Sequence, residues 1–153
     1  MKDHATDYSQ ITEQIFIGSD LCRGLYCPLH SVEFKKLGIC AEVNLEIERN
    51  ETPTPGVDTY IWLPTPDLHA PTQDQLAIGS SAIGEMVGLG NKIYVHCKEG
   101  LGRSPTMVVA YLVRYKGMQV DKSIDFIAQR RPGIHIEDSQ RMALVEFSKK
   151  WSK

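Results

Sequence analysis

The chain has 153 residues, of which 42% are hydrophobic and 24% charged, and its net charge is −2. This length suits one domain with a buried core, and the small net charge argues against a general nucleic-acid or membrane-surface binder. No apolar run approaches the roughly 18 residues of a transmembrane helix, and the polar start at residues 1–7 has no signal-peptide core. We therefore expect one cytoplasmic domain over residues 1–153, without a membrane partner.

The first half of the chain alternates between strand-like and helix-like segments. It begins with a polar arm at residues 1–10, and a β-branched and aromatic run then predicts a first strand that ends at a glycine. Loops with prolines and glycines separate the later elements, and the loop at residues 48–56 is expected to be exposed. In order, we predict a strand at 14–18, a helix at 30–37, and strands at 39–45 and 59–63.

The second half is mainly helical. A loop stiffened by three prolines, Pro64–Thr72, carries one acid and one histidine, and Thr72 is suited to cap the helix that follows. We predict helices at 73–87, 104–116, 121–131 and 137–151, with one strand at 92–96. Residues 107–113 are apolar on all sides, which indicates a buried helix. The order β-α-β-β-α-β-α-α-α predicts an α/β sandwich with a central, mostly parallel sheet flanked by helices.

The loop between the strand at 92–96 and the buried helix has the composition of an anion site. Cys97 is followed by two glycines, Gly100 and Gly102, and then by Arg103. Backbone N–H groups at a helix N-terminus bind phosphate, and glycines let the backbone approach it closely. These N–H groups and Arg103 would stabilise a thiolate. We expect a phosphate-binding loop with a nucleophilic cysteine, although a buried structural cysteine is the alternative.

Each residue of this loop has an expected task. The backbone amides would contact the phosphoryl oxygens, and Arg103 would bind them in bidentate fashion. His96 is expected to orient the loop by hydrogen bonding, and an ordinary histidine at a strand end is the alternative. Ser104 would donate to the sulfur, cap the next helix, or do both. The expected phosphate-binding residues are Lys98, Glu99, Gly100, Leu101, Gly102 and Arg103.

Departure of the leaving group requires a proton donor on a separate element. Asp67 is the preferred candidate because its loop is held stiff by prolines. Asp74 in a predicted helix and Asp58 before a strand are the competitors, and neither is as well placed. His69 is assigned to the rim of the same loop.

Three segments resemble one known family. His96-Cys97 followed by Arg103-Ser104 is similar to the H-C-x5-R-[S/T] signature of the cysteine-dependent protein tyrosine phosphatase superfamily. The segment 66–71 resembles the P-D-x-x-x-P acid loop of compact dual-specificity phosphatases. The segment 131–140 is similar to the R-P-G segment that ends in glutamine in archaeal and small atypical members, and Pro105 also fits that branch.

The resemblance implies a two-step reaction through a phosphocysteine intermediate, with no cofactor and no metal. It implies that Asp67 is the general acid, that Gln140 positions the hydrolytic water, and that Arg131 supports the site. It further implies a substrate that is a phosphorylated protein or peptide, on tyrosine and also on serine or threonine, with phosphate or another oxyanion in the site. The alternatives are phosphoinositides or RNA 5′ ends as substrates, and a phosphate-binding pseudophosphatase.

The other three cysteines, Cys22, Cys27 and Cys40, receive no chemical role. Cys22 and Cys27 are five residues apart, which is not a usual zinc spacing, and no second pair follows them. We interpret all three as packing or surface thiols.

Overall fold

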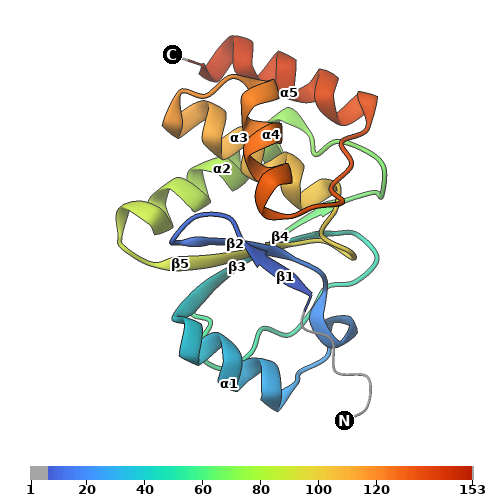
Figure 1. Cartoon of the computed structure of the whole chain (residues 1–153). Coiled ribbons are helices and arrows are strands. Elements are labelled where there is room, and N and C mark those ends of the chain that lie inside the picture. The colour runs from blue at the N-terminus through green and yellow to red at the C-terminus, as the bar shows by residue number, and fades with distance from the viewer. Residues whose placement is uncertain (1–6, 153) are drawn as a thin grey trace.

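In the part of the chain that the structure describes, five strands form one sheet in the order β1-β2-β5-β3-β4 (Figure 1). The computed structural model describes residues 7–152. The strands are β1 Tyr8–Gln10, β2 Ile15–Gly18, β3 Ile39–Glu46, β4 Thr59–Thr65 and β5 Lys92–His96. Only β1 is antiparallel to its neighbour, and the other pairs are parallel. The predicted α/β sandwich with a mostly parallel central sheet is confirmed.

Helices cover both faces of this sheet. Helix α1 lies on one face, and α2 to α5 lie on the other (Figure 1). Their bounds are η1 Leu21–Gly24, a short 3-10 helix, and α1 Pro28–Leu37, α2 Gln73–Gly88, α3 Arg103–Lys116, α4 Val120–Arg130 and α5 Asp138–Trp151. Thr72 caps α2 as predicted, because its hydroxyl accepts a hydrogen bond from the N–H of Gln75 at 3.0 Å. Among the described residues, no helix is long and apolar enough to cross a membrane.

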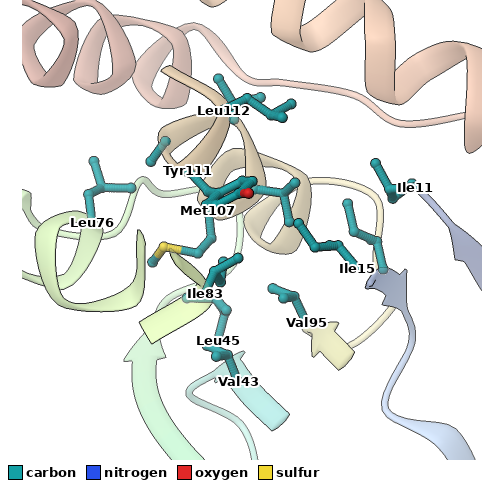
Figure 2. Close-up of a cluster of buried hydrophobic side chains, with 14 of the residues drawn as sticks. Ile11, Ile15, Val43, Leu45, Leu76, Ile83, Val95, Met107, Tyr111 and Leu112 are labelled. Atoms are coloured by element: carbon teal, nitrogen blue, oxygen red, sulfur yellow. The ribbon is translucent and has the colours of Figure 1, made fainter. Parts of the chain in front are cut away.

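The core lies between the sheet and α3, and it fixes where the loop after β5 begins. Every residue of α3 from Arg103 to Val113 is buried, which agrees with the all-apolar run in the sequence. Figure 2 shows Met107 and Tyr111 of this helix above the sheet residues Val43, Leu45 and Val95. The strand β5 is central and the helix α3 is buried, so the loop between them is anchored at both ends.

The structure corrects one prediction for the N-terminus. Residues 8–10 are not a free polar arm, because they form β1 and pair with β2. The ring of Tyr8 packs edge-on against Phe16, and its hydroxyl donates to Glu33 at 2.7 Å. These long-range contacts carry no local sequence signal. The rest of the predicted arm, residues 1–6, lies outside the described residues.

Candidate active site

The loop after β5 turns its carbonyl groups away from Cys97. Five consecutive carbonyls, from 98 to 102, accept hydrogen bonds from groups outside the loop. The donors are the N–H of Asp20 (3.2 Å), the Arg131 guanidinium (2.9 and 2.7 Å), the N–H of His135 (2.7 Å) and the N–H of Thr106 (3.0 Å). Peptide planes held in this way direct their N–H groups to the opposite side, which forms an anion cradle.

Gly100 is required at the tightest point of this loop. Its φ of +73° lies in the left-handed region, and a Cβ there would stand 2.4 Å from the carbonyl oxygen of Gly18. Its own N–H donates to the Cys97 sulfur at 3.3 Å. The glycine therefore allows the loop to curl over the thiol while resting on the end of β2.

Cys97 lies at the base of a cavity of about 300 Å³. The residue is only 3% exposed, and its sulfur is 3.4 Å from the hydroxyl of Ser104. Ser104 is buried in the first turn of α3, where it is within reach to donate to a thiolate. The sulfur thus has two hydrogen-bond contacts, one from the backbone of Gly100 and one from Ser104.

Arg103 is buried beside the same cavity, with its guanidinium divided between two tasks. Its Nη1 and Nη2 atoms bind the two carboxylate oxygens of Glu48 at 2.6 and 2.9 Å, and Nη1 also donates to the carbonyl of Thr65 at 2.7 Å. A guanidinium has five N–H groups, so one on Nη2 and that of Nε remain. The Nε atom is buried and has no hydrogen-bond partner among the described residues. This edge is suited to bind two oxygens of an oxyanion.

Glu48 lies in a loop that is exposed, as predicted, but the sequence analysis gave it no role at the site. The hydrogen bond from Arg103 holds the pKa of the Glu48 carboxyl below its ordinary value, despite partial burial. The pKa of Arg103 is raised, because contact with Glu48 outweighs the effect of burial. Glu48 follows β3 and is distant in sequence from Arg103, so no local pattern marks the pair.

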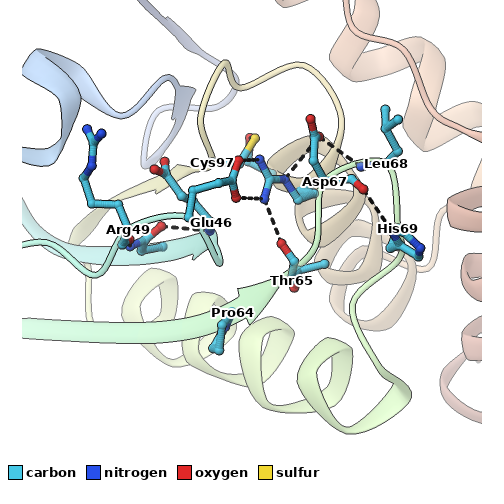
Figure 3. A network of polar contacts seen from close by, with 12 residues as sticks. Glu46, Arg49, Pro64, Thr65, Asp67, Leu68, His69 and Cys97 are labelled. Carbon is cyan, nitrogen blue, oxygen red and sulfur yellow. Dashed lines mark hydrogen bonds and ion pairs between the residues drawn. The ribbon is translucent and has the colours of Figure 1, made fainter.

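The predicted acid, Asp67, borders the same cavity from an exposed turn. Its side chain is 65% exposed, and its carboxylate is 3.6 Å from Nε of Arg103. The same carboxylate accepts the N–H of Leu68, which has a left-handed φ of 66° (Figure 3). The structure thus brings Asp67 to the cavity together with Cys97, whereas the competitors Asp58 and Asp74 do not line it.

Gln140 reaches the cavity from the start of α5. It is 1% exposed, and its amide accepts the N–H of Glu137 at 2.9 Å and donates to the carbonyl of His69 at 3.1 Å. The amide has more donor and acceptor capacity than these two bonds use. Gln140 therefore joins α5 to the acid loop and still presents polar atoms to the cavity.

The imidazole of His96 supports the loop through its backbone, and none of its hydrogen bonds goes to the Cys97 sulfur. Its Nδ1 is 3.3 Å from the carbonyl of Cys97, and its Nε2 is 2.8 Å from Glu42 and 2.6 Å from Glu51. Burial lowers the pKa of His96, but the hydrogen bond with Glu51 outweighs burial and the pKa is raised. The predicted orienting contact of His96 is thus made with the backbone carbonyl of Cys97. The two glutamates were not anticipated.

A second acidic pair lies next to this cluster. Burial, the charge of Asp20 and a hydrogen bond with Asp20 raise the pKa of Glu46 to about 7. The pKa of Asp20 is also raised, chiefly by burial. The base of the loop therefore holds a carboxyl that exchanges its proton near neutral pH.

Comparison with known proteins then identifies the family. The family model described as "Dual specificity phosphatase, catalytic domain" matches residues 26–150. The chain belongs to the dual specificity phosphatase family. This confirms the family expected from the three sequence motifs. The predicted roles of individual residues within the reaction stay predictions.

Two curated relatives and one solved structure resemble the chain over most of its length. The chain is 34% identical over 122 residues to phosphatidylglycerophosphate phosphatase PTPMT2 of Arabidopsis thaliana, covering 75% of this chain and 53% of that protein. It is 32% identical over 179 residues to laforin of Mus musculus, covering 97% and 52%. A crystal structure of PTPMT1 in complex with PI(5)P superposes with a TM-score of 0.82 at 28% identity, over 95% of this chain and 96% of that one. This dual specificity phosphatase chain spans about half the length of these two curated relatives. It spans 42% of a third, phosphatidylglycerophosphate phosphatase PTPMT1 of Arabidopsis thaliana.

Proposed function

We propose that the chain hydrolyses phosphate monoesters through a phosphocysteine intermediate. The observation that carries this proposal is the cradle itself: the outward carbonyls leave the loop N–H groups facing one cavity, which the buried thiol and the Arg103 edge without a hydrogen-bond partner in the described part of the chain also border. An oxyanion placed there meets donors already in position, and such preorganised donors are a large source of transition-state stabilisation.

In the first step the Cys97 thiolate attacks phosphorus. An S–P bond forms while the bond from phosphorus to the ester oxygen breaks, and Asp67 gives its proton to that oxygen. The loop amides and the Nε and Nη2 edge of Arg103 hold the three equatorial oxygens.

In the second step water attacks the phosphocysteine. Gln140 positions the water with its remaining amide donor and acceptor, and Asp67, now ionised, takes the proton from it. Phosphate leaves, and the Ser104 hydroxyl donates to the departing thiolate across the present 3.4 Å contact. The cycle restores both Asp67 and Cys97 without a metal or cofactor.

Phosphoproteins are our first candidate substrates. The cavity opens beside the exposed Asp67 turn, and its rim mixes charges: Lys98 and His135 stand with Glu99 and Glu137. A mixed rim suits varied peptide side chains better than it suits a headgroup with several phosphates. We expect dephosphorylation of phosphotyrosine, phosphoserine and phosphothreonine.

Phospholipid headgroups are the second candidate. Similarity to PTPMT2 and to the PTPMT1 complex with PI(5)P supports this alternative, as does Lys98 directly after the nucleophile. A non-catalytic phosphate-binding role has less support, since cysteine, arginine and acid border one cavity. RNA 5′ ends also have less support, because Glu99 offsets the charge of Lys98 at the rim. A cytoplasmic location stays a prediction.

The test is a side-by-side comparison of kcat/KM on phosphopeptides, phosphatidylglycerophosphate, PI(5)P and 5′-triphosphorylated RNA, without added metal. The proposal predicts turnover that is lost in Cys97→Ser and highest on phosphopeptides. A preference for either lipid would move the substrate to the second candidate. No turnover on any ester by a folded sample would refute the enzyme proposal.

A further inference from the structure

Three side chains with metal-binding atoms meet at the junction of η1 and α1. The sulfurs of Cys22 and Cys27 and a ring nitrogen of His30 lie within 4.8 Å of one another. Cys27 and His30 are each 2% exposed, whereas Cys22 is half-buried. None of the three lines the active-site cavity.

The local backbone explains why these residues converge. Cys27 is the N-cap of α1 and His30 lies three residues later, so both project from the same side of the first helical turn. Cys22 and Arg23 adopt left-handed conformations, with φ of 53° and 56°, which fold η1 back toward this turn. The Cys22 and Cys27 thiols are in hydrogen-bond contact. The sequence analysis argued against a metal because no second cysteine pair follows Cys22 and Cys27. In the structure the third donor is a histidine, His30.

The donor set selects a class of ion. Two sulfurs and one imidazole favour Zn²⁺ and other borderline-soft ions, and they disfavour Mg²⁺ and Ca²⁺, which require oxygen ligands. Tetrahedral zinc with these ligands places its donor atoms about 3.6 Å apart, so the donor atoms would move together by no more than about 1 Å. Because Cys22 is half-buried, solvent water is the natural fourth ligand.

We propose that Cys22, Cys27 and His30 bind one Zn²⁺ ion, with water as the fourth ligand. Both thiols lose their protons to solvent as the two Zn–S bonds form, and no oxidation is involved. The ion joins η1 to α1. The segment before η1 supports the phosphate loop, because the N–H of Asp20 donates to the carbonyl of Lys98. The role of the ion is to hold that support in place, and it takes no part in the phosphoryl transfer.

The test uses the full chain with Cys97→Ser as background, which removes the catalytic thiol as a competing ligand. Zinc affinity is measured by competition with a chromophoric chelator, and Co²⁺ is added to record thiolate-to-metal charge-transfer absorption. We expect one equivalent of tightly bound Zn²⁺, Co²⁺ spectra of a tetrahedral thiolate site, and a higher unfolding temperature with Zn²⁺ present.

Variants assign the ligands. Adding Cys22→Ser or His30→Asn should weaken zinc binding by at least about 100-fold, whereas adding Cys40→Ser, a thiol outside the cluster, should not change it. Cys22→Ser is the decisive variant, since that residue is half-buried and its replacement preserves the packing; far-ultraviolet circular dichroism verifies the fold. Failure of the reduced protein to bind one equivalent of Zn²⁺, or unchanged affinity in Cys22→Ser, would overturn the proposal.

Discussion

At the scale of single residues, the guanidinium of Arg103 binds Glu48 with one edge and faces the cavity with the other. Glu48 binds the end of the guanidinium at 2.6 and 2.9 Å, and Thr65 fixes Nη1 from a third direction. These contacts lock the rotamer and leave the Nε edge pointing to the site. A free arginine would lose conformational entropy on binding phosphate, and this one has lost it already on folding.

Weakening that brace should reduce catalysis. Glu48→Gln removes the charge and one of the two acceptor oxygens that hold Arg103, so we expect kcat/KM on p-nitrophenyl phosphate to fall by about 10-fold or more. The matched control is Glu13→Gln, an exposed acid between β1 and β2, which should leave the rate unchanged. Wild-type kcat/KM in Glu48→Gln would show that Arg103 is held without this carboxylate.

The assignment of Asp67 predicts a dependence on the leaving group. Asp67→Asn removes the proton donor, and general acid catalysis contributes about 10²–10⁴-fold when the leaving group is poor. The loss in kcat/KM should be large for a phosphoserine peptide and small for p-nitrophenyl phosphate, whose phenolate departs without help. An equal loss on both substrates would remove Asp67 from the acid role.

At the scale of elements, the phosphate loop is shaped from outside. Its carbonyls are held by the segment that follows β2, by α3 and by Arg131 after α4. The Arg131 side chain also binds Asp7 and Ser9, each at 3.1 Å. Ser9 is in β1, so the short N-terminal strand belongs to the support of the loop. The loop thus depends on elements from both ends of the chain.

A substitution at Gly100 tests how strongly the shape of the loop depends on its contact with the end of β2. Gly100→Ala forces an alanine to a φ of +73° and places its Cβ against the Gly18 carbonyl. We expect a loss of about 2 kcal/mol or more in the free energy of unfolding, measured by urea denaturation. Gly88→Ala is the control, because a Cβ there meets nothing within 4 Å; it should be neutral or slightly stabilising. Equal stability of the two variants would mean that the loop relaxes around the new methyl group.

Sequence patterns predicted the elements with strong local signals and missed those held by distant contacts. The apolar run after Arg103 identified α3, and Thr72 marked the start of α2. β1 was missed because its three residues are polar and become a strand only by pairing with β2. At the site, the loop and Asp67 carry motifs. Glu42, Glu48 and Glu51 carry none, since their partners are about fifty residues away in the chain.

At the scale of the whole molecule, buried acids lie beneath a site built for anions. Glu46 has a raised pKa of about 7 in place of its ordinary 4.5, because burial and Asp20 disfavour its charge. In the unfolded chain it ionises at the ordinary value. The folded state is therefore penalised progressively as the pH rises from 4.5 through 7, and the penalty is complete above that range.

Removing this charge should stabilise the protein in alkaline conditions. Glu46→Gln is expected to raise the free energy of unfolding by about 1 kcal/mol near pH 8, a value that allows for solvent screening. The gain near pH 5 should be clearly smaller. Urea denaturation of both proteins at the two pH values measures the difference. A gain of equal size at both, or none at pH 8, would contradict a raised pKa for Glu46.

The most direct test of the account is to trap the intermediate. A phosphorylated substrate is mixed with enzyme, the reaction is quenched within one turnover, and the phosphorylated residue is located by mass spectrometry under conditions that preserve thiophosphate esters. The account predicts phosphate on Cys97 in the wild type, more of it in Gln140→Ala because water attack is slowed, and none in Cys97→Ser. Phosphate on another residue, or turnover that persists in Cys97→Ser, would contradict the central claim.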